Sequence, residues 1–408
     1  QMQGDALAAR IEALAQFSSE PNALTRLTLT QAHRNAADLV VSWMAQAGMS
    51  VHIDALATVV GRYEGTDPDG KTLLLGSHID TVRNAGKYDG NFGVIAAIAA
   101  VDRLKRDGVK LPFAIEVLAF GDEEGVRYPS TLTGSRAIAG TFEPATLDDK
   151  DADGVSRREA LARFGTDPNY APKQARDPAR VLAYVEVHIE QGPVLEAQGF
   201  PVGIVTAING ATRGAITVTG KSGHSGTQPM SMRSDALTAA AEMILAIERI
   251  GRSKRGLVAT VGRIETPRGA VNIVPGLVEM SLDVRSPSDS ERREAVERIE
   301  AEIAEIASRR GVAAKFVCSH DMPAAPCEPS LMDALEQSFQ HLGFTPYRLA
   351  SGAGHDAMSF RGRMPIAMIF SRCKAGVSHN PAEYASPGDM EAATAVLYDF
   401  IRTLSSRR

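Results

Sequence analysis

The spacing of hydrophobic positions predicts two helices at the start of the chain, followed by alternating strands and helices. Apolar residues recur every three or four positions over residues 6–17 and 30–47, which predicts two amphipathic helices. Later apolar runs and helical patterns predict strands at residues 72–75, 113–120, 181–188 and 366–370 and helices at 92–106 and 390–404. This alternation predicts an α/β fold with a mainly parallel sheet.

The middle of the chain has a different pattern. Residues 148–178 are polar and irregular, which predicts short helices or loop. Further along, the pattern predicts strands at residues 215–219, 257–264 and 278–284 and helices at 234–250 and 290–309. The last of these helices has one apolar stripe, formed by Val296, Ile299, Ile303 and Ile306. We therefore predict a smaller α+β domain at residues 210–326, inserted into a larger domain formed by residues 1–209 and 327–408.

Size and composition narrow the function classes. A chain of 408 residues is too long for one ordinary compact core, so two domains are expected. The net charge of -5 and the lack of a long basic run argue against a nucleic-acid partner, whereas a small anionic substrate needs only local cations. No apolar run reaches the roughly 20 residues of a membrane span, and the first residues do not resemble a signal peptide.

The cysteines support an intracellular setting. Cys318, Cys327 and Cys373 are too few and too irregularly spaced for a disulfide framework or a cysteine zinc site. We therefore expect a cytoplasmic protein that does not associate with membranes.

Acidic residues and histidines gather at the ends of predicted elements. The segments are GSHIDT (76–81), GKYDG (86–90), GDEEG (121–125), EVHIEQG (186–192) and SHNPAE (378–383). In parallel α/β sheets, ligands bind at the carboxyl ends of strands, so these side chains are expected to meet there. Asp80 lies two positions after His78, within reach of the far imidazole nitrogen. Three adjacent carboxylates at residues 122–124 are costly after a buried strand unless a cation compensates them.

Each segment alone has an ordinary interpretation. A histidine two residues from an aspartate is usually a surface or capping pair, and an acidic run is usually a solvated helix start. Together, however, the segments supply the mixture of imidazole and carboxylate groups that zinc or manganese prefers. The combination therefore predicts a metal centre.

The same segments resemble the motifs of the M20 peptidase-like amidohydrolases. Within them the chain is most similar to the hydantoinase/carbamoylase branch, which includes N-carbamoyl-L-amino acid hydrolases, β-ureidopropionases, allantoate amidohydrolases and ureidoglycolate amidohydrolases. The resemblance spans about residues 70–390, and its most specific parts are HIEQGPVLE and SGAGHDAM. It implies a metallopeptidase-like catalytic domain, an inserted dimerisation (lid) domain, a homodimer and two divalent ions, zinc or manganese, per subunit.

The resemblance also implies roles for individual residues. His78, Asp89 and His188 would hold one ion, and Asp89, Glu124 and His379 the other, with Asp89 bridging. Glu123 would be the general base, and Asp80 would orient His78 from behind.

In the inserted domain the resemblance covers the segment KSGHSGTQPM. Its His224 would stabilise the oxyanion in the partner subunit's site, while Asn272 and Arg285 would grip the substrate carboxylate. Gln191 and His355 would neighbour the ureido or carboxylate group. Two of these residues also have simpler interpretations, His224 as a turn residue and Arg285 as a surface charge. The histidines without a motif are expected to be structural or exposed; they are His33, His52, His320 and His341.

Three functions are consistent with these residues. The first is hydrolysis of a ureido (carbamoyl) C–N bond in a small carboxylate, which releases ammonia and carbon dioxide. The second is an aminoacylase or aminopeptidase that cuts an ordinary amide; His188 argues against it, because peptidase branches carry a carboxylate there. The third is a metal-stabilised binding protein, which has no need of Glu123. We expect the first, and the similarity of GDEEGVRY and AGKYDG to allantoate amidohydrolases slightly favours allantoate over N-carbamoyl-L-amino acids. Hinges are expected near Gly210 and Pro326, with open and closed states.

Overall fold

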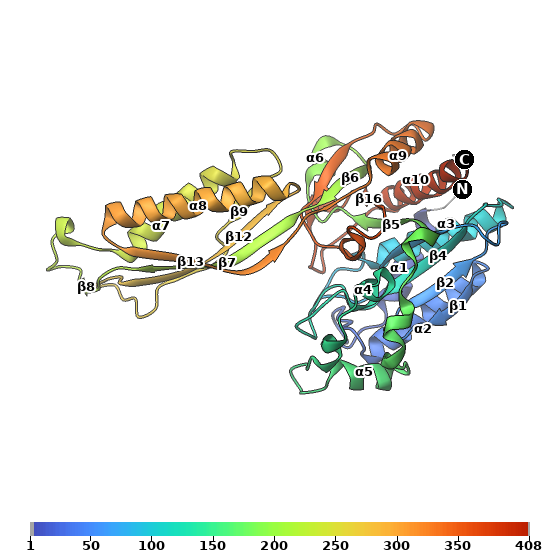
Figure 1. Ribbon diagram of the computed structural model, residues 1–408, viewed down its shortest axis with the longest axis horizontal. Helices are drawn as coiled ribbons and strands as arrows, with labels where there is room; N and C mark the ends of the chain where they lie inside the picture. Colours follow the sequence, from blue (N-terminus) through green and yellow to red (C-terminus); the bar gives the residue numbers. More distant parts are fainter. Residues whose placement is uncertain (1–3, 407–408) are drawn as a thin grey trace. The chain divides into compact units, whose positions relative to one another are not determined.

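The chain forms two compact units (Figure 1). The structure, a computed structural model, describes residues 4–406. Unit 1 contains the described residues up to Thr206, together with Pro326–Leu349 and the described residues from Ala353 on. Unit 2 contains Ala207–Ala325 and the short stretch Ala350–Gly352.

Unit 1 is built on a mixed sheet whose centre is parallel. In spatial order its strands are β1 (Ser50–Ile53), β2 (Val59–Tyr63), β4 (Ala114–Phe120), β3 (Thr72–His78), β5 (Val181–Ile189), β16 (Ile366–Ser371), β6 (Val202–Ile208) and β14 (Ala325–Pro326), and β15 (Arg348–Ser351) pairs with β6. The pairs β4–β3, β3–β5 and β5–β16 are parallel, whereas β1–β2, β2–β4 and β16–β6 are antiparallel. The prediction of an α/β fold with a mainly parallel sheet is therefore confirmed. The carboxyl ends of the four central strands point the same way and form one edge.

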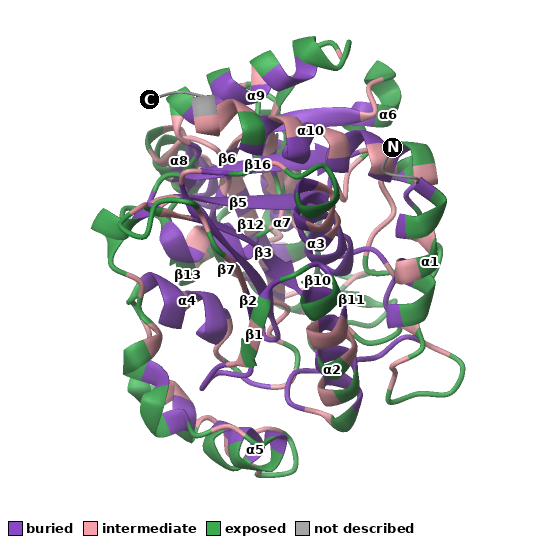
Figure 2. Ribbon diagram, turned by 90° about the vertical axis from the view of Figure 1, so that its right-hand side faces the viewer, coloured by how far each residue is buried: buried purple, intermediate pink, exposed green. Residues whose placement is uncertain are grey.

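Unit 1 also contains helices. They are α1 (Gly4–Ala15), α2 (Gln31–Gln46), α3 (Asn91–Arg106), α4 (Thr133–Ala139), α5 (Arg157–Phe164), α6 (Val194–Gln198), α9 (Pro329–His341) and α10 (Pro387–Ser406). Of these, α2, α3, α9 and α10 contact strands of the sheet. The alanine-rich α3 contacts β3, β4 and β5, and the purple strands and helix faces in Figure 2 mark the buried interior. A Cβ on Gly93 would lie 2.1 Å from the carbonyl oxygen of Val187, so glycine lets α3 approach β5 closely.

The polar stretch near residue 160 folds into short helices, as its pattern predicts. They are η1 (Pro144–Asp148), α5, η2 (Pro168–Gln174) and η3 (Pro178–Arg180). Ser156 and Glu159 form a capping box at the start of α5, which satisfies the first backbone N–H groups of this short helix. Two further 3₁₀ turns of unit 1 are η5 (Asp356–Phe360) and η6 (Lys374–Gly376).

Unit 2 is an antiparallel sheet packed against two long helices. Its elements are β7 (Gly210–Thr219), β8 (Gly223–His224), η4 (Met230–Met232), α7 (Ala236–Gly251), β9 (Val258–Thr260), β10 (Ile264–Glu265), β11 (Ile273–Val274), β12 (Leu277–Ser286), α8 (Asp289–Arg310) and β13 (Ala313–Met322). Along β12 every second residue is buried, and these side chains meet α7 and α8 in one core. The core includes Ile299, Ile303 and Ile306 of the predicted stripe, while Val296 is partly buried.

The prediction of a single strand at residues 257–264 is wrong in detail. Residues 257–264 form two short strands, β9 and β10, rather than one, and both pair with β12. Between them the backbone N–H groups of Gly262 and Arg263 donate to the side-chain Oγ of Ser281, at 3.2 and 3.0 Å. A side-chain hydroxyl has thus replaced backbone acceptors, which interrupts the ladder.

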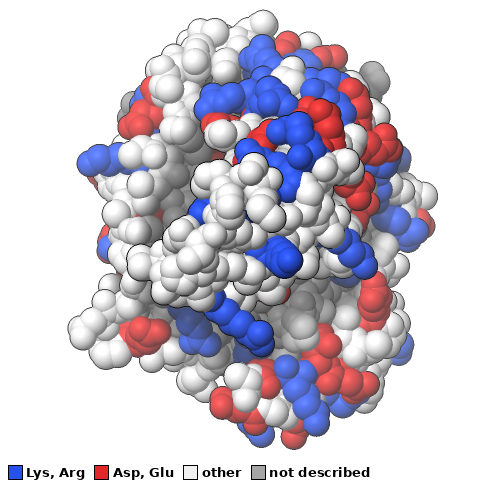
Figure 3. Space-filling model, turned by 90° about the vertical axis from the view of Figure 1, so that its left-hand side faces the viewer, with Lys and Arg blue, Asp and Glu red and all other residues white. Residues whose placement is uncertain are grey.

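The surface charges of unit 2 are largely paired. Ion pairs join α7 or the loop after it to α8, including Arg249–Glu302 and Lys254–Glu294. Acidic and basic side chains are interspersed on the face drawn in Figure 3, so its described residues do not form the continuous basic surface that nucleic-acid binding requires. Within residues 4–406, no helix has both the length and the apolar character needed to cross a membrane.

Candidate metal centre and active site

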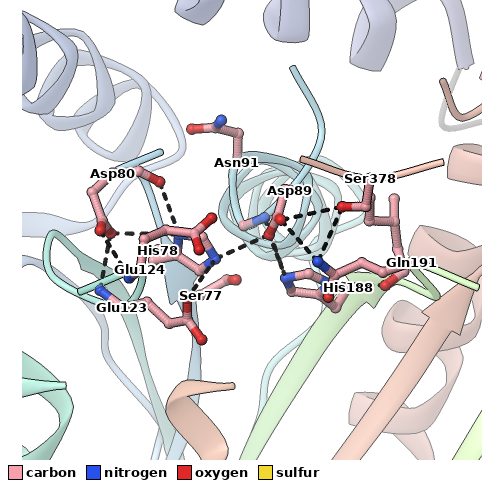
Figure 4. Close-up of polar contacts among 12 residues, drawn as sticks. Ser77, His78, Asp80, Asp89, Asn91, Glu123, Glu124, His188, Gln191 and Ser378 are labelled. Carbon is pink, nitrogen blue, oxygen red and sulfur yellow. Dashed lines mark hydrogen bonds and ion pairs between the residues drawn. The ribbon is translucent and has the colours of Figure 1, made fainter. Parts of the chain in front are cut away.

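His78 is the last residue of β3 and is fully buried at the carboxyl edge of the sheet. Its Nδ1 donates to the backbone oxygen of Asp80 at 2.9 Å, so that Nε2 is left with a lone pair. Nε2 is buried without a hydrogen-bond partner and lies 3.2 Å from Oδ1 of Asp89 (Figure 4). An orphaned buried nitrogen beside a carboxylate is the arrangement expected of a metal ligand.

Asp80 holds two segments of the site. Its carboxylate lies 3.4 Å from Nδ1 of His78 and also accepts from the backbone N–H groups of Glu123 and Glu124, both at 3.1 Å. The side chain predicted to orient His78 therefore also fixes the loop that follows β4.

Asp89 lies at the centre of the cluster. Its Oδ1 is 3.2 Å from Nε2 of His78 and 3.2 Å from Nε2 of His188, while its Oδ2 is 3.1 Å from Nε2 of His379. Gly90, which follows it and precedes α3, has a φ of 68° and no room for a side chain, because a Cβ would lie 2.4 Å from the His78 ring. The backbone of this turn can therefore approach the imidazoles closely, as a bridging carboxylate requires.

The three acidic residues after β4 have different partners. Oε2 of Glu123 lies 3.7 Å from Nε2 of His78, and Oε2 of Glu124 lies 3.5 Å from Nε2 of His379. Asp122 instead accepts from Thr133 at 2.6 Å and from Arg157 of α5 at 2.5 Å. We expected a positive charge beside the three carboxylates, and the buried Arg157 supplies it in part.

The end of β5 supplies His188, with His355 behind it. Nδ1 of His188 donates to the Ile189 carbonyl at 2.8 Å, which directs Nε2 toward Asp89. The His355 ring is fully buried, with its centroid 4.4 Å from that of His188. Gln191 has a left-handed backbone with a φ of 58°, and its Nε2 donates to Asp89 at 2.9 Å and to Ser378 at 3.1 Å. Both predicted substrate contacts of unit 1 therefore border the cluster.

The loop after β16 supplies His379, whose side chain is 50% exposed. Its backbone is left-handed, with a φ of 53°. It is the most exposed of the predicted metal ligands, since the others are buried or partly buried.

These residues fit two metal ions. The ligand atoms of His78, Asp89 and His188 lie within 4.8 Å of one another, and so do those of Asp89, Glu124 and His379. Imidazole nitrogens and carboxylate oxygens suit zinc and manganese alike. Because Asp89 belongs to both groups, the arrangement could hold two ions that share one carboxylate.

The pKa values express the crowding of charge in this cluster. Burial raises the pKa of Glu123 well above its usual value, and repulsion from Glu124 adds to this effect. Burial likewise raises the pKa of Glu124 to about 8. The hydrogen bond with Asp89 raises the pKa of His379 to about 9. The site thus favours added positive charge, which a bound divalent ion supplies directly.

Comparison with known proteins identifies the family. Residues 74–403 match the family model for Peptidase family M20/M25/M40. The chain belongs to this family.

Two relatives and one solved structure illustrate the similarity. N-carbamoyl-L-amino acid amidohydrolase from Geobacillus stearothermophilus is 40% identical over 405 residues, covering 99% of each chain. Allantoate deiminase from Arabidopsis thaliana is 38% identical over 431 residues, covering 98% of this chain and 82% of the relative. The crystal structure of an amidase of the hydantoinase/carbamoylase family from Burkholderia multivorans matches with a TM-score of 0.92 at 31% identity, covering 98% of this chain and 97% of the other. The resemblance inferred from the motifs is confirmed, as is the prediction that this M20-family protein is a hydrolase.

The remaining predicted site residues of this M20-family hydrolase lie in unit 2, on or beside two different sheets. His224 is paired with Ile273, and the Asn272 carbonyl accepts from the Ser225 N–H at 2.9 Å, so His224 and Asn272 are neighbours. Arg285 lies near the far end of β12, eight residue steps after Leu277 (277 to 285). The Gly220 N–H donates to the Gly276 carbonyl at 2.9 Å, so the β8–β11 pair adjoins the Leu277 end of β12, whereas Arg285 lies roughly 26 Å along that strand from Leu277, at about 3.3 Å per residue.

The guanidinium group of Arg285 already has hydrogen-bond partners within unit 2. It forms two hydrogen bonds with the Asp283 carboxylate, at 2.9 and 3.0 Å, and donates to the Gly352 carbonyl at 2.7 Å. A substrate carboxylate would therefore share this guanidinium or displace Asp283 from it.

Two polar residues near the site were not among the predicted site residues. Arg157 lies in a polar stretch beside Arg158, and only the fold brings it to Asp122. Asp356, which follows His355, is fully buried, and its charge contributes to the raised pKa of Glu123. Asp356 is part of the SGAGHDAM motif, so the motif contained it although the sequence assigned it no role.

Proposed function

We propose that this M20-family protein hydrolyses the ureido (carbamoyl) C–N bond of a small carboxylate, using two divalent ions. The observation that carries the proposal is the position of Asp89 between two imidazoles on one side and His379 on the other, with Glu123 beside them. The relatives named above act on N-carbamoyl-L-amino acids and on allantoate, which supports a ureido substrate.

The chain's own groups have distinct parts in the reaction. His78, Asp89 and His188 would hold one ion, and Asp89, Glu124 and His379 the other. When bound, such ions lower the pKa of a water molecule and polarise the scissile carbonyl. Oε2 of Glu123 would take a proton from the attacking water and deliver it to the leaving nitrogen. The balance is RNH–CO–NH2 + H2O → RNH2 + CO2 + NH3.

Asp80 and Gln191 would keep this arrangement in place. Asp80 fixes the backbone of Glu123 and Glu124, so the base and the neighbouring ligand move together. Gln191 donates to both Asp89 and Ser378 through its amide nitrogen, and its amide oxygen would be the group that neighbours the substrate's ureido nitrogens.

The geometry of unit 2 supports a homodimer with shared sites. A small ureido carboxylate is much shorter than the roughly 26 Å of β12 between Leu277 and Arg285. The pair His224 and Asn272 belongs to the β8–β11 side, which adjoins the Leu277 end, so this pair and Arg285 of the same chain would serve different substrate molecules. In a dimer, His224 of one subunit would stabilise the oxyanion in the other subunit's site. Exposed apolar side chains lie close to this pair in sequence, including Met230 at 77% and Met232 at 71%, as expected of a surface that a second subunit covers.

The decisive test is a substrate panel for metal-stripped protein reloaded with manganese or zinc. Ammonia release would be measured with allantoate, ureidoglycolate, N-carbamoyl-L-amino acids and N-carbamoyl-β-alanine, and amine release with an N-acetyl amino acid and a dipeptide. Turnover of ureido compounds alone is expected, and the best of them identifies the substrate. Turnover of only the acetyl compound or the dipeptide would refute the proposal in favour of an aminoacylase or aminopeptidase. The Glu123→Gln variant controls for contaminating activity.

A further inference from the structure

Glu383 is a buried carboxylate at the edge of the metal centre that none of the roles above includes. It ends the SHNPAE segment after β16 and is 3% exposed. Among the described residues, four groups could hold a metal ion, and Glu383 belongs to none of them.

Its two oxygens join two parts of the site. Oε1 accepts from the backbone N–H groups of Tyr88 and Asp89, both at 2.9 Å. Oε2 accepts from the hydroxyl of Ser378 at 2.8 Å. One side chain therefore connects the backbone of the shared ligand Asp89 to the residue that precedes His379.

The surrounding backbone leaves space for this connection. A Cβ on Gly86 would lie 2.4 Å from the Glu383 carboxyl group, so any larger residue at position 86 would displace it. The turn that carries Asp89 is thus shaped around Glu383.

The two groups of ligands depend on this connection to different degrees. His78 and His188 are buried residues of β3 and β5, whose positions the sheet fixes. His379 lies on a loop, and residues 379–382 are all exposed. Its left-handed φ of 53° is uncommon for a residue other than glycine. Ser378 and Glu383 enclose this exposed stretch and tie it to the interior.

We propose that Glu383 is a positioning residue that assembles the second metal site, the one formed by Asp89, Glu124 and His379. It acts by hydrogen-bond geometry: it fixes the backbone of Asp89 and the start of the His379 loop relative to each other. Removing it weakens the second ion selectively, because the first site keeps both of its strand-borne histidines. This inference rests on the proposed two-ion function.

Two variants at position 383 distinguish an effect of hydrogen-bond geometry from an effect of charge. Glu383→Ala removes all three hydrogen bonds. Glu383→Gln keeps them, because its amide oxygen accepts from both backbone N–H groups and its amide nitrogen donates to the Ser378 hydroxyl. The matched control is Asp54→Asn, at a buried carboxylate between β1 and β2 that accepts from the N–H groups of Leu56 and Thr58 at 2.9 and 3.0 Å.

The measurement is a calorimetric titration of the metal-free proteins with Mn²⁺, followed by the electron paramagnetic resonance signal of exchange-coupled ion pairs. The unsubstituted protein, Glu383→Gln and Asp54→Asn are expected to bind two ions and give the coupled signal. Glu383→Ala is expected to keep the first ion and bind the second about 10- to 100-fold more weakly, which is the usual effect of losing an outer partner of a metal ligand.

Each other outcome overturns the inference in a recognisable way. Two ions bound normally by Glu383→Ala would show that Glu383 positions nothing. Equal weakening of both ions would indicate a general structural role, and an equal defect in Glu383→Gln would assign the effect to charge. If Glu383→Ala does not fold, Ser378→Ala removes the Oε2 link together with the contacts of this hydroxyl with Gln191 and Asp89, and unchanged second-ion binding by this variant would refute the proposal. Fewer than two ions in the unsubstituted protein would refute the two-ion function itself, which distinguishes the two failures.

Discussion

His33 makes folding stability depend on pH. This residue of α2 is completely buried, and its Nδ1 accepts from the Leu29 N–H at 2.9 Å. Its other ring nitrogen has no hydrogen-bond partner and faces Gly121, where a Cβ would lie 2.4 Å away. Burial lowers the pKa of His33 to about 4, and the charges of Arg26 and Arg34 add to this effect against the attraction of Asp80.

The sign and size of the effect follow from the two pKa values. The folded chain keeps His33 neutral until about pH 4, whereas the unfolded chain protonates it near its ordinary value of 6.5. Between these values the unfolded state binds more protons, so the free energy of unfolding falls as the pH falls. At about 1.4 kcal/mol per pKa unit, the loss from pH 6.5 to pH 4 is about 3 kcal/mol.

The only tryptophan of the chain provides the assay. Trp43 lies on α2 with His33 and is 8% exposed, so its fluorescence reports unfolding around His33. Urea unfolding would be followed from pH 7 to pH 4 for the unsubstituted protein and for His33→Gln, whose amide oxygen can accept from Leu29 but does not titrate. His52→Gln, at an exposed histidine of β1, is the matched control.

The difference between the proteins is the quantity to compare, since other titrating groups cancel in it. The free energy of unfolding of the unsubstituted protein should fall by about 3 kcal/mol relative to His33→Gln as the pH falls from 6.5 to 4. A difference that stays constant over this range would refute the reasoning, and so would an equal change in His52→Gln.

Three further predictions concern the site. Glu123→Gln should retain both metal ions while losing most of its turnover, and loss of metal in elemental analysis would contradict its role as a base that is not a ligand. Arg157→Met should lower the free energy of unfolding by about 3–5 kcal/mol, because it leaves the buried Asp122 carboxylate without its cation. Adding Asp122→Asn should recover part of this loss in urea unfolding, and no recovery would disprove the pairing argument. Mixed dimers of Glu123→Gln and His224→Ala subunits should regain activity that neither variant has alone, and inactive mixed dimers would exclude a role for His224 in the partner's site.

The position of the site could be predicted because it follows from a parallel sheet. His78 ends β3, Glu123 and Glu124 follow β4, and His188 lies in β5. These strands are adjacent and parallel, so side chains at their carboxyl ends meet along one edge. An apolar run followed by a polar motif is visible in the sequence, and it carries most of this information.

Contacts between distant segments could not be predicted. Nothing near Arg157 in the sequence indicates that α5 reaches Asp122, and Glu383 resembles an ordinary loop carboxylate until its hydrogen bonds to Tyr88 and Asp89 are known. The break between β9 and β10 depends on the side-chain hydroxyl of Ser281, which accepts from the backbone N–H of Gly262 in place of a backbone carbonyl. Strand β13 is mostly exposed, so it lacks the alternation of buried and partly exposed side chains that marks β12 as a strand. Such features arise from three-dimensional neighbours, which periodicity does not encode.

The place of β16 in the sheet has a consequence for how the chain is made. β16 lies between β5 and β6, yet all of unit 2 is translated before it. During synthesis β5 therefore presents an open edge on the side where β16 will pair, while unit 2 already contains all the strands and helices of its own core. Pairing between such distant segments closes a long loop and is slow. Unit 2 should consequently fold first on the ribosome, and the unpaired edge of β5 is the surface that chaperones would need to protect from aggregation.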